Sequence, residues 1–179
     1  MKTKLLSILI AAGVIAVSQN ALAVDGTITF NGSITAQTCT INGNGSGSNN
    51  FTVTLPTVSS STLASAGQTA GRTPFHIVLT NCTPNTGTVH TFFEAGPTTD
   101  STTGNLILGA GGATNVQLGL LNSDATAIKA GFADASQNSK PVTFTNGSAT
   151  LSYYVQYVAT GAATAGAANS NVLYTIAYQ

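Results

Sequence analysis

The sequence predicts an all-β domain, and three observations lead to this fold class. Only 6% of the residues are charged and 42% are hydrophobic, and Gly, Thr, Ser, Asn and Ala dominate in place of the Leu, Glu and Lys of helical stretches. Apolar and polar residues alternate in several short runs, which is the period of a half-buried strand. Turn-rich segments separate these runs. We expect one domain, with a β-sandwich as the predicted architecture and a β-barrel as the second option.

The first 23 residues have the composition of a secretory signal peptide. Lys2 and Lys4 precede an apolar run over residues 5–17, and small residues at the spacing that a signal peptidase recognises lead up to Ala23. The run is shorter than the roughly 20 residues that a membrane-spanning helix needs. We expect cleavage after Ala23, which leaves residues 24–179 with three basic and five acidic residues and a net charge of −2. This balance argues against a nucleic-acid partner.

The predicted mature chain begins with a long strand, VDGTITFNGSI, which alternates without an exception. A strand of about eleven residues extends on the order of 36 Å, which is long for the first strand of a domain. One face of this strand carries the apolar and small residues Val24, Gly26, Ile28, Phe30, Gly32 and Ile34.

Cys39 and Cys82 are the only cysteines of the chain. In an exported protein an isolated pair is most simply a disulfide, which would restrict the unfolded chain by roughly 4 kcal/mol. A metal site would need further ligands at short spacing, and neither cysteine has them nearby. The sequence therefore predicts a structural disulfide.

Further half-buried strands are predicted at residues 51–55, 75–79 and 116–120, where every second residue is apolar. The dipeptide Asn-Gly at 146–147 separates two more alternating runs and favours a two-residue hairpin turn. If that turn is tight, Phe144 pairs with Ala149 and Val142 pairs with Leu151.

The chain ends within another predicted strand. Residues 172–179 alternate, with Val172, Tyr174, Ile176 and Tyr178 on one face. No partner strand follows, and the segment has none of the Lys, Pro or bulge devices that keep sheet edges from pairing. We expect such an edge to aggregate unless another strand covers it.

Together these residues resemble the major structural subunits of chaperone–usher fimbriae, close to type 1 fimbrial shaft pilins. The resemblance covers essentially the whole mature sequence. The matching features are the arm GTITFNGSI, the pair of cysteines, the segment YVATGAATAGAAN, a glycine at the fourteenth position from the end (Gly166), and the penultimate Tyr178.

The resemblance implies an incomplete immunoglobulin-like sandwich that lacks its final strand. A periplasmic chaperone first fills the resulting groove, and at an outer-membrane usher the arm of the next subunit replaces it by donor-strand exchange. With the signal peptide at 1–23, the resemblance divides the rest of the chain into a donor arm at 24–35 and a pilin domain at 36–179.

The implied site residues fall into two groups. The donor strand is Val24, Gly26, Ile28, Phe30, Gly32 and Ile34, and the acceptor groove and chaperone site comprise Gly166, Val172, Tyr174, Ile176, Tyr178 and the carboxylate of Gln179. The expected partners are identical subunits, the chaperone and the usher, with no cofactor, no metal, no nucleic acid and no membrane insertion. The expected location is an extracellular fimbria that supports adhesion of a Gram-negative bacterium.

Three alternatives to this interpretation are an enzyme, a minor fimbrial adaptor and a secreted adhesin. An enzyme is not expected, because His76 and His90 are the only histidines and no nucleophile, phosphate-binding or zinc motif is present. A minor fimbrial adaptor would carry the same arm and groove. A secreted carbohydrate-binding adhesin could use Tyr153, Tyr154 and Tyr157 as a stacking surface, although we expect Tyr153 and Tyr157 to pack within the sheet or core.

Overall fold

The structure is a computed structural model that describes residues 26–32, 34 and 36–179. The chain divides into two units, residues 1–34 and 35–179. The predicted signal peptide, residues 1–23, and Val24 lie outside the described residues. All the assigned strands belong to the second unit.

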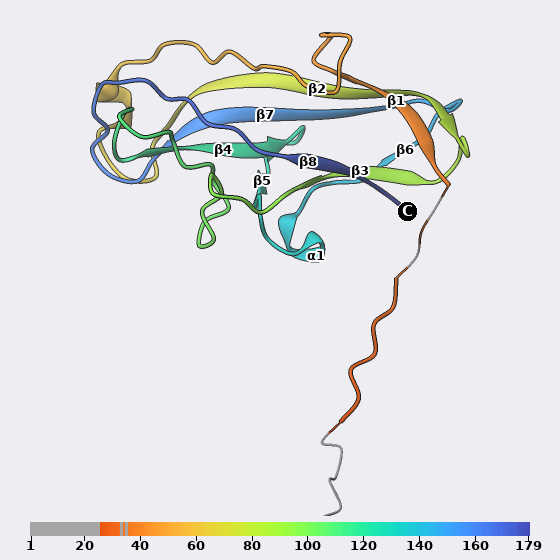
Figure 1. The fold of residues 1–179 in the computed structure, drawn as a ribbon. Helices are drawn as coiled ribbons and strands as arrows, with labels where there is room; N and C mark the ends of the chain where they lie inside the picture. Colours follow the sequence, from red (N-terminus) through yellow and green to blue (C-terminus); the bar gives the residue numbers. More distant parts are fainter. Residues whose placement is uncertain (1–25, 33, 35) are drawn as a thin grey trace, which may run out of the picture. The chain divides into compact units, whose positions relative to one another are not determined.

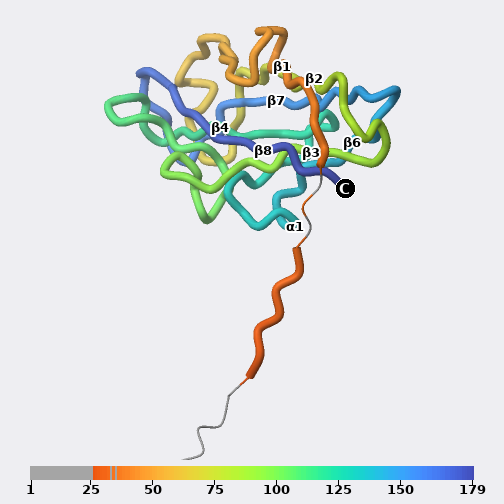
Figure 2. The backbone as a smooth tube through the Cα atoms, turned by 45° about the vertical axis from the view of Figure 1, so that its right-hand side comes forward, coloured from red at the N-terminus to blue at the C-terminus, as the bar shows by residue number. Residues whose placement is uncertain are grey.

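This second unit contains two antiparallel sheets (Figures 1 and 2). The five-stranded sheet has the order β1 (Thr38–Gly43), β2 (Thr69–Thr83), β7 (Ala149–Ala159), β4 (Val116–Asn122) and β5 (Ala127–Ile128). The three-stranded sheet has the order β6 (Val142–Thr143), β3 (Thr88–Phe93) and β8 (Tyr174–Tyr178). Two single-turn helices, η1 (Ser60–Leu63) and α1 (Asp134–Gln137), complete the described elements. The all-β prediction is confirmed.

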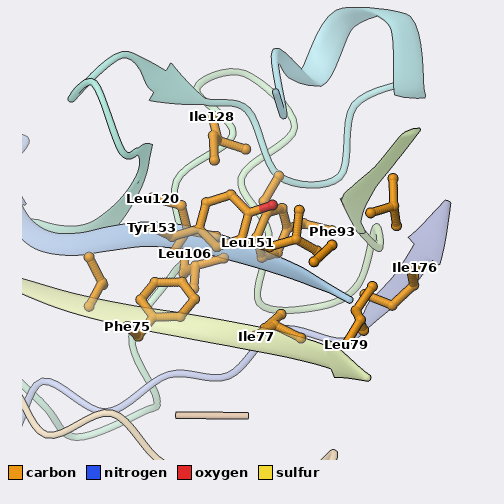
Figure 3. Packing of buried hydrophobic residues seen from close by; sticks show 14 of the residues in the cluster. Phe75, Ile77, Leu79, Phe93, Leu106, Leu120, Ile128, Leu151, Tyr153 and Ile176 are labelled. Carbon is orange, nitrogen blue, oxygen red and sulfur yellow. The ribbon is translucent and has the colours of Figure 1, made fainter. Parts of the chain in front are cut away.

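The core lies between the two sheets (Figure 3). Phe75 from β2 and Phe93 from β3 both contact Tyr153 of β7, with ring centroids 5.5 Å apart in each pair. The Tyr153 hydroxyl donates to Thr91 Oγ1 at 2.9 Å, so this buried polar group is satisfied. Tyr153 therefore packs in the core as expected. Ile176 of β8 is buried against the same cluster.

The predicted strands at 75–79 and 116–120 are confirmed within β2 and β4. In β2 the alternation is clear, because Phe75, Ile77 and Leu79 are buried and the residues between them are partly exposed. Strand β4 is instead buried on nearly every position. It lies between β7 and β5 in the sheet, and Leu118 also forms an isolated antiparallel bridge with Leu106.

The hairpin prediction at 146–147 is half right. Asn146 and Gly147 have positive φ values of 51° and 70°, as a type I′ turn requires, and Thr145 and Ser148 exchange two main-chain hydrogen bonds across the turn. The expected pairing of Val142 with Leu151 is wrong, because Val142 pairs with Val89 of β3 in the other sheet. Past the tight turn the two runs separate into different layers of the sandwich.

The disulfide between Cys39 and Cys82 is formed, as expected, and it links β1 to the end of β2. The two Cα atoms are 4.2 Å apart and the cysteines are separated by 43 positions in sequence. In the described part of the chain, none of the helices has the length and apolar character needed to cross a membrane.

Candidate strand-acceptor groove

A groove of about 1130 Å³ opens on one side of the sandwich. One rim consists of residues 170–176 and Tyr178, which include most of β8. The other rim comes from an extended segment that follows β1, here called the wall segment and defined as residues 49–58. Core side chains that form the floor are Ile41, Phe75, Ile77, Phe93, Leu106, Leu118, Leu120 and Val155. The groove is therefore an open slot over the hydrophobic core.

Strand β8 is the last strand of its sheet, and among the described residues it pairs only with β3 (Figure 1). At one end of this pair, Thr88 and Gln179 exchange two main-chain hydrogen bonds of 2.9 and 2.8 Å. Because such bonds alternate along an antiparallel ladder, the main-chain groups of Tyr174, Ile176 and Tyr178 point away from β3. These residues present an unpaired strand edge to the groove.

The wall segment has the alternation that the sequence predicted for residues 51–55, because Phe51, Val53 and Leu55 are half-buried against the core while Thr52 and Thr54 are exposed. It is not a strand of either sheet, however. Within the described residues, its main-chain groups form no hydrogen bond to another main-chain group. The prediction of a paired strand here is wrong, and the groove has a second unpaired main-chain edge.

Aromatic side chains contact one another across the groove. The ring of Phe51 in the wall segment lies 6.1 Å from that of Tyr174 in an edge-on arrangement and 6.2 Å from that of Phe75. The Tyr174 hydroxyl donates to the carbonyl oxygen of Asn49 at 2.7 Å. Burial raises the pKa of the Tyr174 and Tyr178 hydroxyls above the usual value for tyrosine. The walls are therefore apolar with a few hydrogen-bonding groups.

Four of the predicted acceptor residues line this groove, namely Val172, Tyr174, Ile176 and Tyr178. Gln179 does not line it, and its main chain pairs with Thr88 instead. Gly87, with φ of 104°, leaves room for this end of the chain, since a Cβ there would lie 2.6 Å from the carbonyl oxygen of Gln179.

Gly166 lies away from the groove lining, packed against the 112–113 loop. A Cβ at this position would lie 2.7 Å from the main-chain nitrogen of Ala113. The structure therefore gives Gly166 a role in the close approach of two loops. The floor residues and the wall segment were not among the predicted site residues, although the alternation at 51–55 marked the wall segment as half-buried.

In the first unit, the apolar side chains of the predicted donor arm are exposed. Ile28 is 79% exposed, Phe30 is 87% exposed, and Ile34 is fully exposed. A Cβ placed on Gly26 or Gly32 would meet no other atom within 4 Å. Three large apolar side chains exposed within one short segment are unusual on a protein surface.

Comparison with known proteins identifies the family. Residues 55–179 match the profile of the family described as type-1 fimbrial protein, A. The chain belongs to this fimbrial protein family. The pilin is 54% identical to the major fimbrial subunit SMF-1 of Stenotrophomonas maltophilia over 162 residues, which cover 87% of this chain and 94% of the relative. It is 49% identical to the F17 fimbrial protein of Escherichia coli over 181 residues, which cover 98% of this chain and 97% of the relative.

The fold of the pilin also matches a solved rod subunit. The crystal structure of the P pilus rod subunit PapA superposes with a TM-score of 0.59 at 18% identity, covering 79% of this chain and 99% of that chain. Such a likeness concerns the fold alone, and it agrees with an incomplete immunoglobulin-like sandwich. The pilin is thus a structural subunit of a fimbria at the cell surface.

Because the family consists of structural subunits, the pilin is not an enzyme. His90 is the one buried histidine among the described residues, and its Nε2 atom lies 2.7 Å from Oδ1 of Asp134, the first residue of α1. This contact links β3 to α1. His76 is partly exposed on the face of β2 that points away from Phe75 and Ile77. Neither histidine lines the groove.

Proposed function

We propose that the groove receives residues 24–35 of a second copy of this pilin, so that copies polymerise head to tail by donor-strand exchange. The observation that carries this proposal is the pair of unpaired main-chain edges on either side of the groove, one on β8 and one on the wall segment. A strand inserted between them would satisfy both edges with main-chain hydrogen bonds.

The arm has the side chains that such a slot needs. Its apolar residues alternate, so that Ile28, Phe30 and Ile34 would all point toward the groove floor while the intervening polar residues would face solvent. Gly32 would let the arm approach the groove closely at one position. Because a one-residue slip would turn every apolar side chain outward, this alternation would also fix the register.

The contact between subunits would be heterologous. Each copy donates its arm to one neighbour and accepts an arm from another, and a contact of this kind generates an open filament when it does not close. The 54% identity to a major fimbrial subunit supports a place in the fimbrial shaft, in preference to a minor adaptor. A self-contained carbohydrate-binding adhesin has less support, because its sandwich would need no open groove.

A periplasmic chaperone and an outer-membrane usher are the proposed assembly partners. The groove exposes part of the hydrophobic core, and an exposed apolar strand edge aggregates unless it is covered. A chaperone strand would cover the groove after residues 1–23 direct export from a Gram-negative cytoplasm, and basic chaperone residues would bind the carboxylate of Gln179. The support for these partners is the family together with the exposed groove.

Polymerisation of purified protein tests the proposal. The mature chain, residues 24–179, and a variant lacking residues 24–35 are released from denaturant under oxidising conditions, and chain assembly is followed by light scattering and unheated gels. Ladders of multimers from the mature chain alone, which a synthetic arm peptide suppresses, are expected. Equal multimer formation by the two proteins would rule out the arm as donor.

A further inference from the structure

We propose that the hydroxyls of Tyr157 and Tyr174 hold the wall segment in place, so that both tyrosines are positioning residues for entry of the donor strand. This inference rests on the proposed donor-strand mechanism and adds to it the groups that keep one side of the acceptor site ordered before the donor arrives.

The hydrogen bonds of the wall segment lead to this assignment. Tyr157 donates to the carbonyl oxygen of Pro56 at 3.3 Å, and Tyr174 donates to that of Asn49 at 2.7 Å. In the described part of the chain, these are the only hydrogen bonds that connect residues 49–58 to the sheets. The two bonds lie at opposite ends of the wall segment and come from different strands, β7 and β8.

Side chains near both ends of the wall segment pack closely against glycines. Gly71 lies at an irregularity in the pairing of β2 with β7, and a Cβ there would be 2.8 Å from the Tyr157 ring and 3.3 Å from the Val58 side chain. A Cβ on Gly43 would lie 1.9 Å from the ring of Phe51. Because neither glycine has a side chain, Tyr157 and Phe51 can pack closely enough to fix the two ends of the segment.

The two tyrosine bonds leave the central part of the wall segment available. They use the carbonyls of Asn49 and Pro56, which flank residues 51–55. The main-chain groups of residues 51–55 therefore remain free to pair with an incoming strand. A segment with no ladder partner loses conformational freedom when a donor pairs with it, and prior ordering reduces this loss on binding.

A substitution at Tyr157 distinguishes a positioning effect from the loss of a direct contact with the donor strand. Tyr174 lines the groove, so a change there could also alter contacts to the donor, whereas Tyr157 is not part of the groove lining. Tyr154 on the same strand is a matched control, because it is half-buried and its hydroxyl makes no hydrogen bond to the described residues. Removing the hydroxyl of Tyr157 should therefore weaken donor binding, while removing that of Tyr154 should not.

The test measures binding of a fluorescent peptide of residues 25–35 to the mature chain, at a concentration where light scattering shows only monomers. We expect Tyr157→Phe and Tyr174→Phe each to weaken peptide affinity about three- to tenfold, as loss of one hydrogen bond predicts, with Tyr154→Phe unchanged. Hydrogen exchange of the free chain is measured in parallel. Amides of residues 51–55 should exchange faster in the first two variants, while amides of β7 keep the protection of the unmodified protein.

The outcomes separate this inference from the proposed function. If the unmodified chain binds the peptide and Tyr157→Phe matches Tyr154→Phe in both affinity and exchange, the positioning role is wrong while donor-strand binding stands. If the unmodified chain does not bind the peptide, the proposed function is wrong, and the positioning role, which rests on it, is wrong as well. Faster exchange of the β7 amides in Tyr157→Phe would show general destabilisation, which also contradicts a local positioning role.

Discussion

Replacement of Phe30 by alanine in the donor arm should sharply weaken the contact between subunits. Phe30 is 87% exposed in the arm and would be buried on entry into the groove of a neighbouring copy. A phenylalanine buries about 150–250 Å² at about 25 cal/mol per Å², and the alanine methyl retains part of this gain, which leaves a loss of about 3 kcal/mol. This corresponds to an affinity about a hundredfold weaker.

The assay is competition between labelled and unlabelled arm peptides for the mature chain under monomeric conditions. The unlabelled peptides carry the natural sequence, Phe30→Ala, or the control Thr29→Ala, whose side chain falls on the opposite, solvent-facing side of the arm. We expect the control peptide to compete like the natural one. A Phe30→Ala peptide that competes within threefold of the natural peptide would refute insertion of this face of the arm.

Three further predictions concern the pilin domain. Replacing Cys39 and Cys82 by serine should lower the free energy of unfolding by about 4 kcal/mol, measured by urea denaturation, because a loop spanning 43 positions is no longer closed. Gln137→Ala should destabilise the domain by about 2–4 kcal/mol in the same assay, since its buried amide makes three hydrogen bonds to main-chain groups; unchanged stability would contradict this. Hydrogen bonds, the strongest from Lys140, lower the pKa of Asp124 from 3.8 to about 2. The ionised Asp124 therefore stabilises the folded domain fully above pH 3.8, and this stabilisation is lost as the pH falls through 2. Asp124→Asn should flatten the dependence of the unfolding free energy on pH over this interval, and an unaltered pH profile would exclude the effect.

The alternating patterns predicted which faces of the strands are buried, but they did not predict which strands are neighbours. The Asn-Gly turn at 146–147 forms as expected, yet Val142 joins the other sheet, because alternation is satisfied equally by any partner that covers the same face. The same limit applies to residues 51–55, whose burial pattern was right and whose expected ladder is absent.

The sequence pattern indicated the part of the candidate groove that lies on one strand, but not the parts where distant segments meet. The alternation of residues 172–178 marked the rim formed by β8, and Val172, Tyr174, Ile176 and Tyr178 line the groove. The opposite rim and the hydroxyl of Tyr157 could not be predicted, because the bond from Tyr157 to Pro56 joins residues 101 positions apart. Such a contact depends on tertiary packing, which no local pattern encodes.

The central claim, that the domain lacks one strand which the arm supplies, is tested most directly by thermal unfolding of two oxidised proteins. One is residues 25–179 in the natural order, and the other lacks the arm at its start and carries DGTITFNGSI after Gln179 through a short flexible linker. We predict that the relinked protein is a soluble monomer with a much higher unfolding midpoint, while the natural order is unstable or polymerises. A natural-order protein that is already a stable monomer, and that gains nothing from relinking, would contradict the missing strand and favour a self-contained secreted binding domain.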